Sequence, residues 1–208
     1  MRMAFFFDQS RCMGCNTCTV ACKDTYNVNP GPVSYRKHET YEIEDSEGVF
    51  YPLVMSCNHC ENPICVKACS VGAITKRSDG IVYVDRSKCQ GLQACILMCP
   101  FAAPDIADRK QEPTYSDKWI SRHPMQKCNL CMEMLDRGEE TVCVRACPAH
   151  AIQVGDFDKL MRDNPGAVQL SYSQFKYAYT NDPNGTSNTG PSFIIKPRKP
   201  LTVTGSNR

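Results

Sequence analysis

Cysteine is the residue type in this chain whose number and spacing could support chemistry. The sequence contains 15 cysteines among 208 residues, and they gather in four runs. The runs are Cys12, Cys15, Cys18 and Cys22; Cys57, Cys60, Cys65 and Cys69; Cys89, Cys95 and Cys99; and Cys128, Cys131, Cys143 and Cys147. Thiolates at short, repeated spacings can hold a metal ion or a metal cluster, and cysteines can also form disulfides.

Three chemistries therefore compete for these cysteines: disulfides, zinc sites and iron–sulfur clusters. Disulfide frameworks are typical of small secreted chains with an even number of cysteines. This chain is longer than such chains and has an odd number of cysteines. Zinc sites favour two C-x2-C pairs a dozen or more residues apart, which only the fourth run partly resembles. Triplets such as Cys12-x2-Cys15-x2-Cys18 fit a cubane cluster better. The pattern favours iron–sulfur clusters, with zinc as the main alternative.

The second and third runs together have the pattern of a two-cluster ferredoxin that lacks one ligand. In bacterial ferredoxins each cluster takes three cysteines from one run and its fourth from the distant cysteine of the other run. The third run ends in Cys99-Pro100, but Leu92 stands where a cysteine is expected three residues after Cys89. This leucine predicts an incomplete ligand set.

Pairing the two middle runs leaves the first and fourth runs to complete each other. The prediction is two ferredoxin-like units, the second inserted in the first, that hold four clusters. The ligand sets are Cys12, Cys15, Cys18 and Cys147; Cys128, Cys131, Cys143 and Cys22; Cys57, Cys60, Cys65 and Cys99; and Cys89, Cys95 and Cys69, with Leu92 at the vacant corner. His59 fits a hydrogen-bonding role better than a ligand role, because every cysteine position of its run is filled.

The chemistry of leucine predicts the type of the last cluster. An aliphatic side chain cannot bind iron, and a corner iron without a protein ligand is easily lost. We expect three [4Fe-4S] clusters and one [3Fe-4S] cluster whose reduction potential lies above those of its four-iron neighbours. The alternative is four [4Fe-4S] clusters, the last with water, hydroxide or a nearby side chain on its fourth iron.

The elements that position these runs are short, and the predicted fold class is α+β. A strand at 5–8 leads into the first run, a helix begins at 19–23, and a hairpin of 35–43 and 49–55 turns at 45–48. Short helices are expected at 132–135, 141–146 and 156–163. The chain after residue 166 is polar and rich in turns, and only residues 193–195 of that part resemble a strand.

The chain divides accordingly into five segments. These are 1–56, the first half of the outer ferredoxin unit with the hairpin; 57–100, the inner unit; 101–127, an insertion; 128–154, the second half of the outer unit; and 155–208, a C-terminal helix and an extended tail. We expect the tail to lie on this protein or on a partner.

Composition restricts the other functions. The formal net charge of +2 gives no argument for binding nucleic acid. No stretch approaches the roughly 20 apolar residues of a membrane-spanning helix, and the apolar run at 3–7 is too short for a secretory signal. No nucleophile–base arrangement or phosphate-binding glycine loop suggests catalysis by this chain alone. Outside the cytoplasm, the chain would depend on a partner that carries it there already folded.

The order of the runs resembles that of the four-cluster iron–sulfur subunits of the molybdopterin oxidoreductase family, most nearly the dimethyl sulfoxide reductase subunit. Cys-Asn-His-Cys-Glu-Asn-Pro at 57–63 and Ile-Ile-Lys-Pro at 194–197 carry the same resemblance, which covers nearly the whole chain. It implies an electron-transfer subunit docked on a large catalytic subunit that holds molybdenum or tungsten in a bis-pterin cofactor. Electrons would pass between that site and a membrane quinone subunit or a soluble carrier.

The resemblance also implies a location and leaves alternatives. Export, where it occurs, would use the twin-arginine signal of the catalytic subunit, which favours the periplasm or the outer face of the membrane over the cytoplasm. Two features depart from the dimethyl sulfoxide reductase subunit, namely a longer insertion of 27 residues before Cys128 and Leu92 in place of cysteine. Nitrate reductase subunits look similar at the second position, with a non-cysteine residue and a three-iron cluster. The alternative functions are a freestanding polyferredoxin that serves soluble enzymes and a purely structural cluster protein.

Overall fold

The computed structural model describes residues 1–42, 50–106, 111 and 116–198. The predicted hairpin turn at 45–48 lies outside the described residues. So do residues 107–110 and 112–115 of the predicted insertion and residues 199–208 of the predicted tail.

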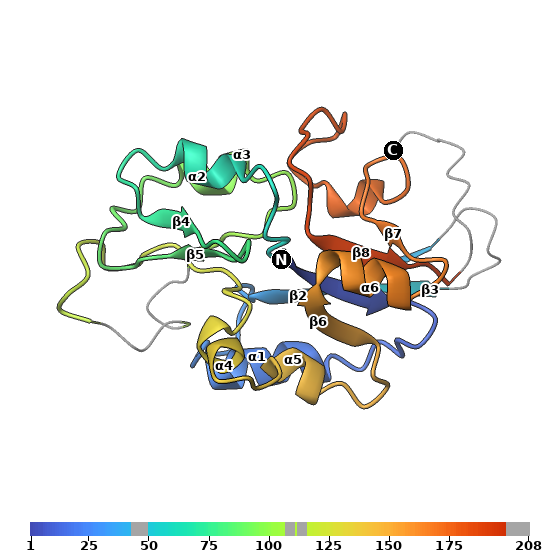
Figure 1. The fold of residues 1–208 in the computed structure, drawn as a ribbon. Coiled ribbons are helices and arrows are strands. Elements are labelled where there is room, and N and C mark those ends of the chain that lie inside the picture. Colours follow the sequence, from blue (N-terminus) through green and yellow to red (C-terminus); the bar gives the residue numbers. More distant parts are fainter. Residues whose placement is uncertain (43–49, 107–110, 112–115, 199–208) are drawn as a thin grey trace.

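A four-stranded sheet with the order β6-β1-β8-β7 runs through the molecule (Figure 1). Strand β1 (Met3–Asp8) pairs antiparallel with β6 (Ile152–Asp156) and parallel with β8 (Phe193–Lys196). The short strand β7 (Val168–Gln169) pairs antiparallel with β8 at the edge. The unbroken apolar run of β1 fits an inner strand that is covered on both faces.

Alternate side chains of β1 contribute to different parts of the core. Phe5 and Phe7 belong to the large cluster that contains buried cysteines of all four runs. Phe6 packs instead with Leu160 of helix α6 (Phe157–Asp163) and with Ile194 of β8. This division follows from the period of two in a strand, which sends successive side chains to opposite faces.

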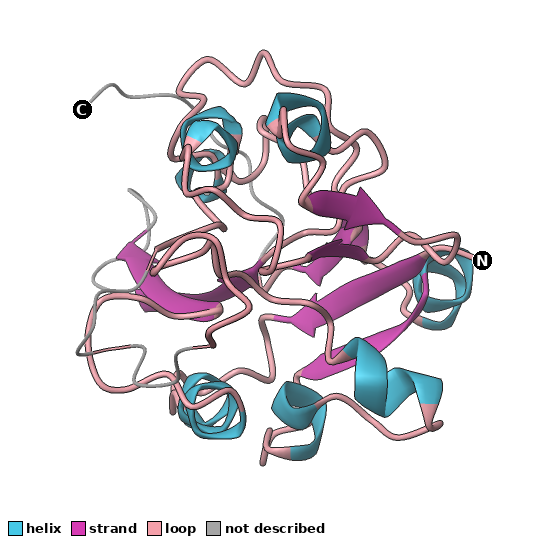
Figure 2. Ribbon diagram, turned by 90° about the vertical axis from the view of Figure 1, so that its left-hand side faces the viewer, coloured by secondary structure: helices cyan, strands magenta, loops and turns pink. Residues whose placement is uncertain are grey.

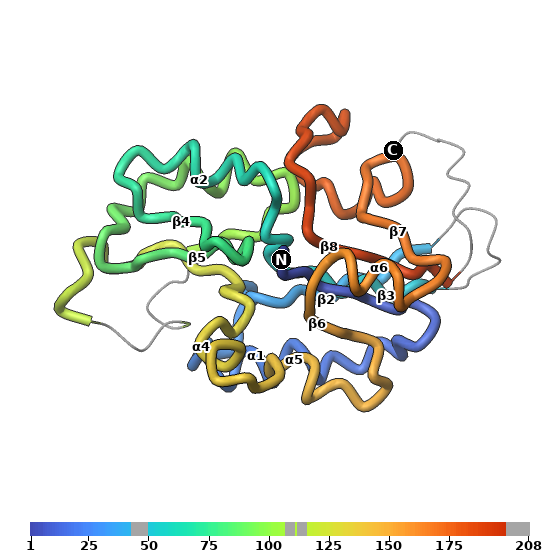
Figure 3. The backbone as a smooth tube through the Cα atoms, in the orientation of Figure 1, coloured from blue at the N-terminus to red at the C-terminus, as the bar shows by residue number. Residues whose placement is uncertain are grey.

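Two pairs of short helices contribute cysteines to all four runs. Helix α1 (Thr17–Thr25) packs against α5 (Val142–Arg145), and α5 contacts β6. Helix α2 (Ile64–Ala68) packs against α3 (Ala94–Met98) and contacts the hairpin of β4 (Ile74–Lys76) and β5 (Val82–Val84). Figure 3 shows the N-terminal part of the chain beside the part that carries α4, α5 and β6, although the two are far apart in the sequence.

The remaining elements surround this frame. A second hairpin joins β2 (Arg36–Glu42) to β3 (Phe50–Ser56), and β2 contacts α1. Helix α4 (Met132–Asp136) precedes α5, and a single turn of 3-10 helix, η1, spans Lys176–Ala178. Figure 2 shows the strands between helices on opposite sides of the molecule. In the described part of the chain, no helix is long and apolar enough to cross a membrane.

The structure agrees with most of the expected elements and shows where the strand near the C-terminus lies. A mixed fold of short helices and strands is confirmed, as are the hairpin, within one residue at its described ends, and the helix at 156–163, which begins one residue later. The expected strand at 193–195 forms as β8 within the four-stranded sheet. Phe193, Ile194 and Ile195 are completely buried between β1 and β7, because an apolar β-prone run is more stable inside the sheet than on a surface.

Candidate metal centres

The loops between the cysteines of each run share an unusual backbone conformation. Gly14 and Asn16 follow Cys12 with φ of 72° and 61°, and Gly91 and Gln93 follow Cys89 with φ of 74° and 61°. His59, Leu130 and Cys131 also have positive φ, in the second and fourth runs. Left-handed residues curl a loop tightly, so successive side chains converge on one point. The same spacing therefore produces the same loop at two places in the chain.

The first predicted ligand set lines one cavity. Cys12, Cys15 and Cys18 come from the loop before α1 and the start of α1, and Cys147 comes from the end of α5. The backbone N–H of Ala151 donates to Sγ of Cys147 at 3.3 Å. The cavity joins parts of the chain that only the tertiary fold brings together.

A second cavity is lined by the cysteines of the third predicted set. They are Cys57, Cys60, Cys65 and Cys99. His59 lies between Cys57 and Cys60 and is completely buried. Its Nδ1 accepts a hydrogen bond from the backbone N–H of Val82 at 2.9 Å. This contact agrees with the expectation of a hydrogen-bonding role for His59.

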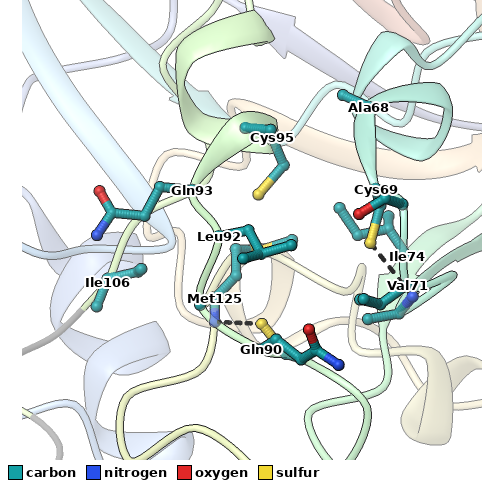
Figure 4. Close-up of a pocket in the computed structure, with 15 residues that line it drawn as sticks. Ala68, Cys69, Val71, Ile74, Gln90, Leu92, Gln93, Cys95, Ile106 and Met125 are labelled. Carbon is teal, nitrogen blue, oxygen red and sulfur yellow. Dashed lines mark hydrogen bonds between the residues drawn. The ribbon is translucent and has the colours of Figure 1, made fainter.

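Leu92 lies at a third cavity together with Cys69, Cys89 and Cys95. Figure 4 shows its side chain facing the same space as the sulfur atoms of Cys69 and Cys95. The backbone N–H of Ala73 donates to Sγ of Cys69 at 3.3 Å, which repeats the contact of Ala151 with Cys147. This cavity measures about 50 Å³, against about 20 Å³ for each of the other two, so the leucine does not close the site.

The fourth set is the most deeply placed. Its members, all buried, are Cys22, Cys128, Cys131 and Cys143. Cys128, Cys143 and Cys131 are electrostatic neighbours of Cys22 and raise the pKa of its thiol, after burial as the main cause. The structure thus groups these four thiols around one another, although no residue of the first run lies near the fourth in sequence.

Burial keeps most of these thiols neutral when no metal is bound. Desolvation raises the pKa of Cys99 to about 11 and those of Cys65 and Cys128 to about 12, with repulsion from neighbouring thiolates adding to it. The pKa of Cys15 is lowered instead, because its exposed sulfur accepts a hydrogen bond from the Thr17 hydroxyl at 3.3 Å. Thiolates in such groups need a cationic partner, which iron supplies.

The residues fit iron–sulfur clusters better than disulfides. All 15 cysteines lie within the described residues and all are free thiols. Backbone N–H groups also point at sulfur, including that of Met125 at 3.4 Å from Sγ of Cys89. Hydrogen bonds to cluster sulfur are a recognised means of tuning such centres. Loops, cavities and donors thus form a consistent cluster-binding arrangement.

Two buried basic residues were not anticipated from the sequence. Arg36 and Lys127 are 2% and 4% exposed and lie among the cysteine groups. Lys127 immediately precedes Cys128, and that adjacency is a signal that sequence reasoning could have used. Arg36 gives no comparable signal, since a basic residue that opens a β-prone hairpin is most often solvated.

Comparison with known proteins supports iron–sulfur clusters as the groups bound by these cysteines. The sequence model of a family described as 4Fe-4S dicluster domain matches residues 48–157, just over half of the chain. The chain therefore belongs to the 4Fe-4S dicluster family. Over 97% of its length, it is 34% identical to a component of the anaerobic dimethyl sulfoxide reductase of Escherichia coli, and the match covers 91% of that component.

Two further relatives have other substrates in their names. A subunit of the selenate reductase of Mesobacillus selenatarsenatis is 34% identical over 72% of this chain and 58% of its own length. The thiosulfate reductase electron transfer subunit of Salmonella typhi is 34% identical over 73% of this chain and 74% of its own length. Proteins similar to this chain thus accompany reductases of different small molecules.

Proposed function

We propose that this chain is the electron-transfer subunit of a molybdopterin oxidoreductase and conducts electrons between a catalytic subunit that holds molybdenum or tungsten and a second redox partner. The observation that carries the proposal is the gathering of 15 cysteines into four groups, three of which face cavities. When bound, iron–sulfur clusters supply one-electron oxidation and reduction. The similarity to subunits of dimethyl sulfoxide, selenate and thiosulfate reductases supports the assignment of partner.

The ligand sets of the proposal are those that the run spacing predicts. The cysteine-lined cavities support three sets, and the mutual neighbours of Cys22 support the remaining one. We assign [4Fe-4S] clusters to the three sets with four cysteines. For Cys69, Cys89 and Cys95, we assign a [3Fe-4S] cluster, because Leu92 offers no ligand atom toward the cavity that it lines.

The two helix pairs support an arrangement of two ferredoxin-like units. In this proposal the outer unit combines 1–56 with 128–154, and the inner unit is 57–100. Matching hydrogen bonds at Cys69 and Cys147, each from the residue four positions later, support an internal repeat. The insertion at 101–127 and the segment 155–208 are additions to these two units. The segment 155–208 joins the outer unit through β8, which pairs with β1.

Burial of the thiols has a direct role in the proposed function. Apolar surroundings exclude water and oxidants from the buried set of Cys22, Cys128, Cys131 and Cys143, and short backbone loops hold the sulfur atoms in place. Exchanging the fourth cysteine between the halves of a unit brings its two sites close together, which suits transfer of electrons from one to the next. The second partner is a membrane quinone subunit or a soluble carrier, and we place the complex in the periplasm or on the outer face of a membrane, by export with the catalytic subunit.

Purification from native extract tests the proposal. The chain should elute from gel filtration with a much larger subunit that contains molybdopterin, and substrate added to the reduced complex should reoxidise its iron–sulfur signals. Elution of the loaded chain by itself, with no such subunit in any fraction, would favour a freestanding polyferredoxin. Signals that never respond to substrate in the intact complex would favour a structural role.

A further inference from the structure

Arg36 is a cation enclosed by the core of the protein. Its Nη2 donates to Oγ of Ser56 at 3.3 Å, directly across the β2–β3 hairpin. Its guanidinium lies over the ring of Phe5, 4.4 Å from the ring centroid. Among the described residues, no aspartate or glutamate forms an ion pair with it. A buried charge without a carboxylate is costly unless another anion compensates it.

The groups that face Arg36 are cysteine sulfur atoms, which become anionic thiolates when they bind iron. Burial lowers the pKa of Arg36, but the neighbouring cysteines together more than offset this effect and leave the pKa raised. These neighbours are Cys143, Cys128, Cys18 and Cys22. Three of these four cysteines belong to the deeply buried set, and Cys18 belongs to the set at the neighbouring cavity. Arg36 therefore lies against the outer pair of cysteine groups.

Lys127 lies against cysteines of the inner unit, as Arg36 lies against those of the outer unit. Its Nζ donates to the backbone carbonyl of Cys128 at 2.9 Å and to that of Val82. It lines the cavity of Cys57, Cys60, Cys65 and Cys99 and, as a secondary influence after burial, lowers the pKa of Cys65 and Cys99. No carboxylate in the described ranges forms an ion pair with Lys127 either.

The two cations mark the junction of the two cysteine-bearing units. Cys57 of the inner unit is an electrostatic neighbour of Cys128 of the outer unit. His59 lies between Cys57 and Cys60, and both cations are its electrostatic neighbours. Since Nδ1 of His59 accepts a hydrogen bond, this histidine is neutral with its proton on Nε2. The positive charge at the junction therefore belongs to Arg36 and Lys127.

We propose that Arg36 and Lys127 are the counter-charges of the two cluster sites that meet at this junction, and that they raise the reduction potentials of these two sites. The inference rests on the proposed function, because it requires clusters in both sets. Each one-electron reduction adds a negative charge to a site, and a fixed cation nearby in a medium of low dielectric constant stabilises the reduced form. The same cations reduce the repulsion between two adjacent anionic sites.

The test is a redox titration of the purified complex, followed by electron paramagnetic resonance. Arg36→Gln should lower the midpoint potential of the Cys22–Cys128–Cys131–Cys143 site, and Lys127→Gln that of the Cys57–Cys60–Cys65–Cys99 site. We expect at least a tenfold change in the reduction equilibrium, about 59 mV for a one-electron couple. The site beside Leu92 serves as internal reference, because neither Arg36 nor Lys127 lines its cavity.

Matched variants separate charge from structure. Arg36→Lys keeps the charge and should recover most of the midpoint, whereas a shift as large as that of Arg36→Gln would reduce Arg36 to a packing role. Arg162→Gln and Lys159→Gln remove exposed cations from α6 and should leave all four midpoints unchanged. Equal shifts of every site in Arg36→Gln, or no shift in either glutamine variant, would overturn the proposal.

Iron content and the signals of the wild-type complex distinguish this inference from the proposed function. Absence of clusters from the wild type would reject both. Four assembled clusters with unshifted midpoints in the variants would reject only the role of the cations. If Arg36→Gln fails to assemble its sites, Lys127→Gln and Arg36→Lys decide, and an unchanged midpoint in Lys127→Gln then contradicts the proposal.

Discussion

At the residue scale, Leu92 alters a site that is otherwise built like its neighbours. The loop that carries it has the same left-handed positions as the loop after Cys12. Its side chain lines the cavity and is 61% exposed, so the site is also open to solvent. The backbone would therefore present a cysteine at this position as well as it presents leucine, and in the proposed ligand set only the side chain differs.

Leu92→Cys should convert the proposed three-iron cluster into a four-iron cluster. The new thiolate adds negative charge and holds the corner iron, so the midpoint potential should fall, by about 59 mV or more if the equilibrium changes tenfold. Electron paramagnetic resonance of the air-oxidised protein measures the loss of the three-iron signal. Leu97→Cys is the matched control, because Leu97 is 77% exposed on α3, the helix that follows Leu92, and does not line the cavity. A spectrum of Leu92→Cys identical to the wild type would contradict the ligand set.

At the element scale, β8 links the end of the chain to its beginning. It pairs in parallel with β1, from Phe5 opposite Phe193 to Asp8 opposite Lys196. Ile194 lies on the face toward α6, and Ile195 lies on the face toward the cysteine-containing core. Strand β8 therefore stabilises the position of β1, which leads directly into the first cysteine run.

Ile194→Ala should destabilise the protein by about 2–5 kcal/mol, because it removes buried methylene groups and leaves a cavity. The measurement is the midpoint of chemical denaturation, followed by circular dichroism and by the visible absorbance of the clusters. Val20→Ala removes aliphatic carbon from a residue that is 65% exposed on α1 and should change stability by no more than roughly 0.5 kcal/mol. Equal effects of the two substitutions would show that β8 is dispensable to the sheet.

At the scale of the whole molecule, the cysteines are part of the core that holds the fold together. Cys18, Cys57, Cys128 and Cys143 belong to one hydrophobic cluster with Phe5 and Tyr51, and Cys89 and Cys95 belong to another. Helices α2, α3 and α4 each have five residues, which is too short for independent stability in water. Bound clusters should therefore cross-link elements that cannot persist by themselves.

Removal of iron should accordingly unfold much of the chain, and the removal should be easier at low pH. Each buried thiol that binds iron must lose a proton, and the pKa values of about 11 for Cys99 and about 12 for Cys65 mean that the metal-free thiols are protonated near neutral pH. Protons then compete with iron increasingly as the pH falls. Iron retained against a fixed concentration of chelator, measured from pH 8 to pH 5 together with far-ultraviolet circular dichroism, checks this. Retention that is independent of pH, or full helix content after iron loss, would contradict it.

The cysteine groups were predictable from the sequence because cluster binding is largely a local property. A C-x2-C-x2-C loop brings three thiols together through its own backbone, and the position of Leu92 follows from counting residues after Cys89. The cavities group the cysteines as the spacing predicts, and the cluster ligation itself stays a prediction. Strong local patterns likewise predicted the hairpin and the α6 helix.

The sequence by itself thus determined the kind of cofactor and the cysteine runs, and it predicts that the Leu92 site lacks one ligand. Only the tertiary structure decided that β8 lies inside the sheet and that Arg36 and Lys127 lie buried between the cysteine groups. The physical reason is the range of the interactions. Ligand spacing is fixed by neighbouring residues, whereas burial of a strand or a cation depends on side chains from distant parts of the chain, such as Cys143 beside Arg36.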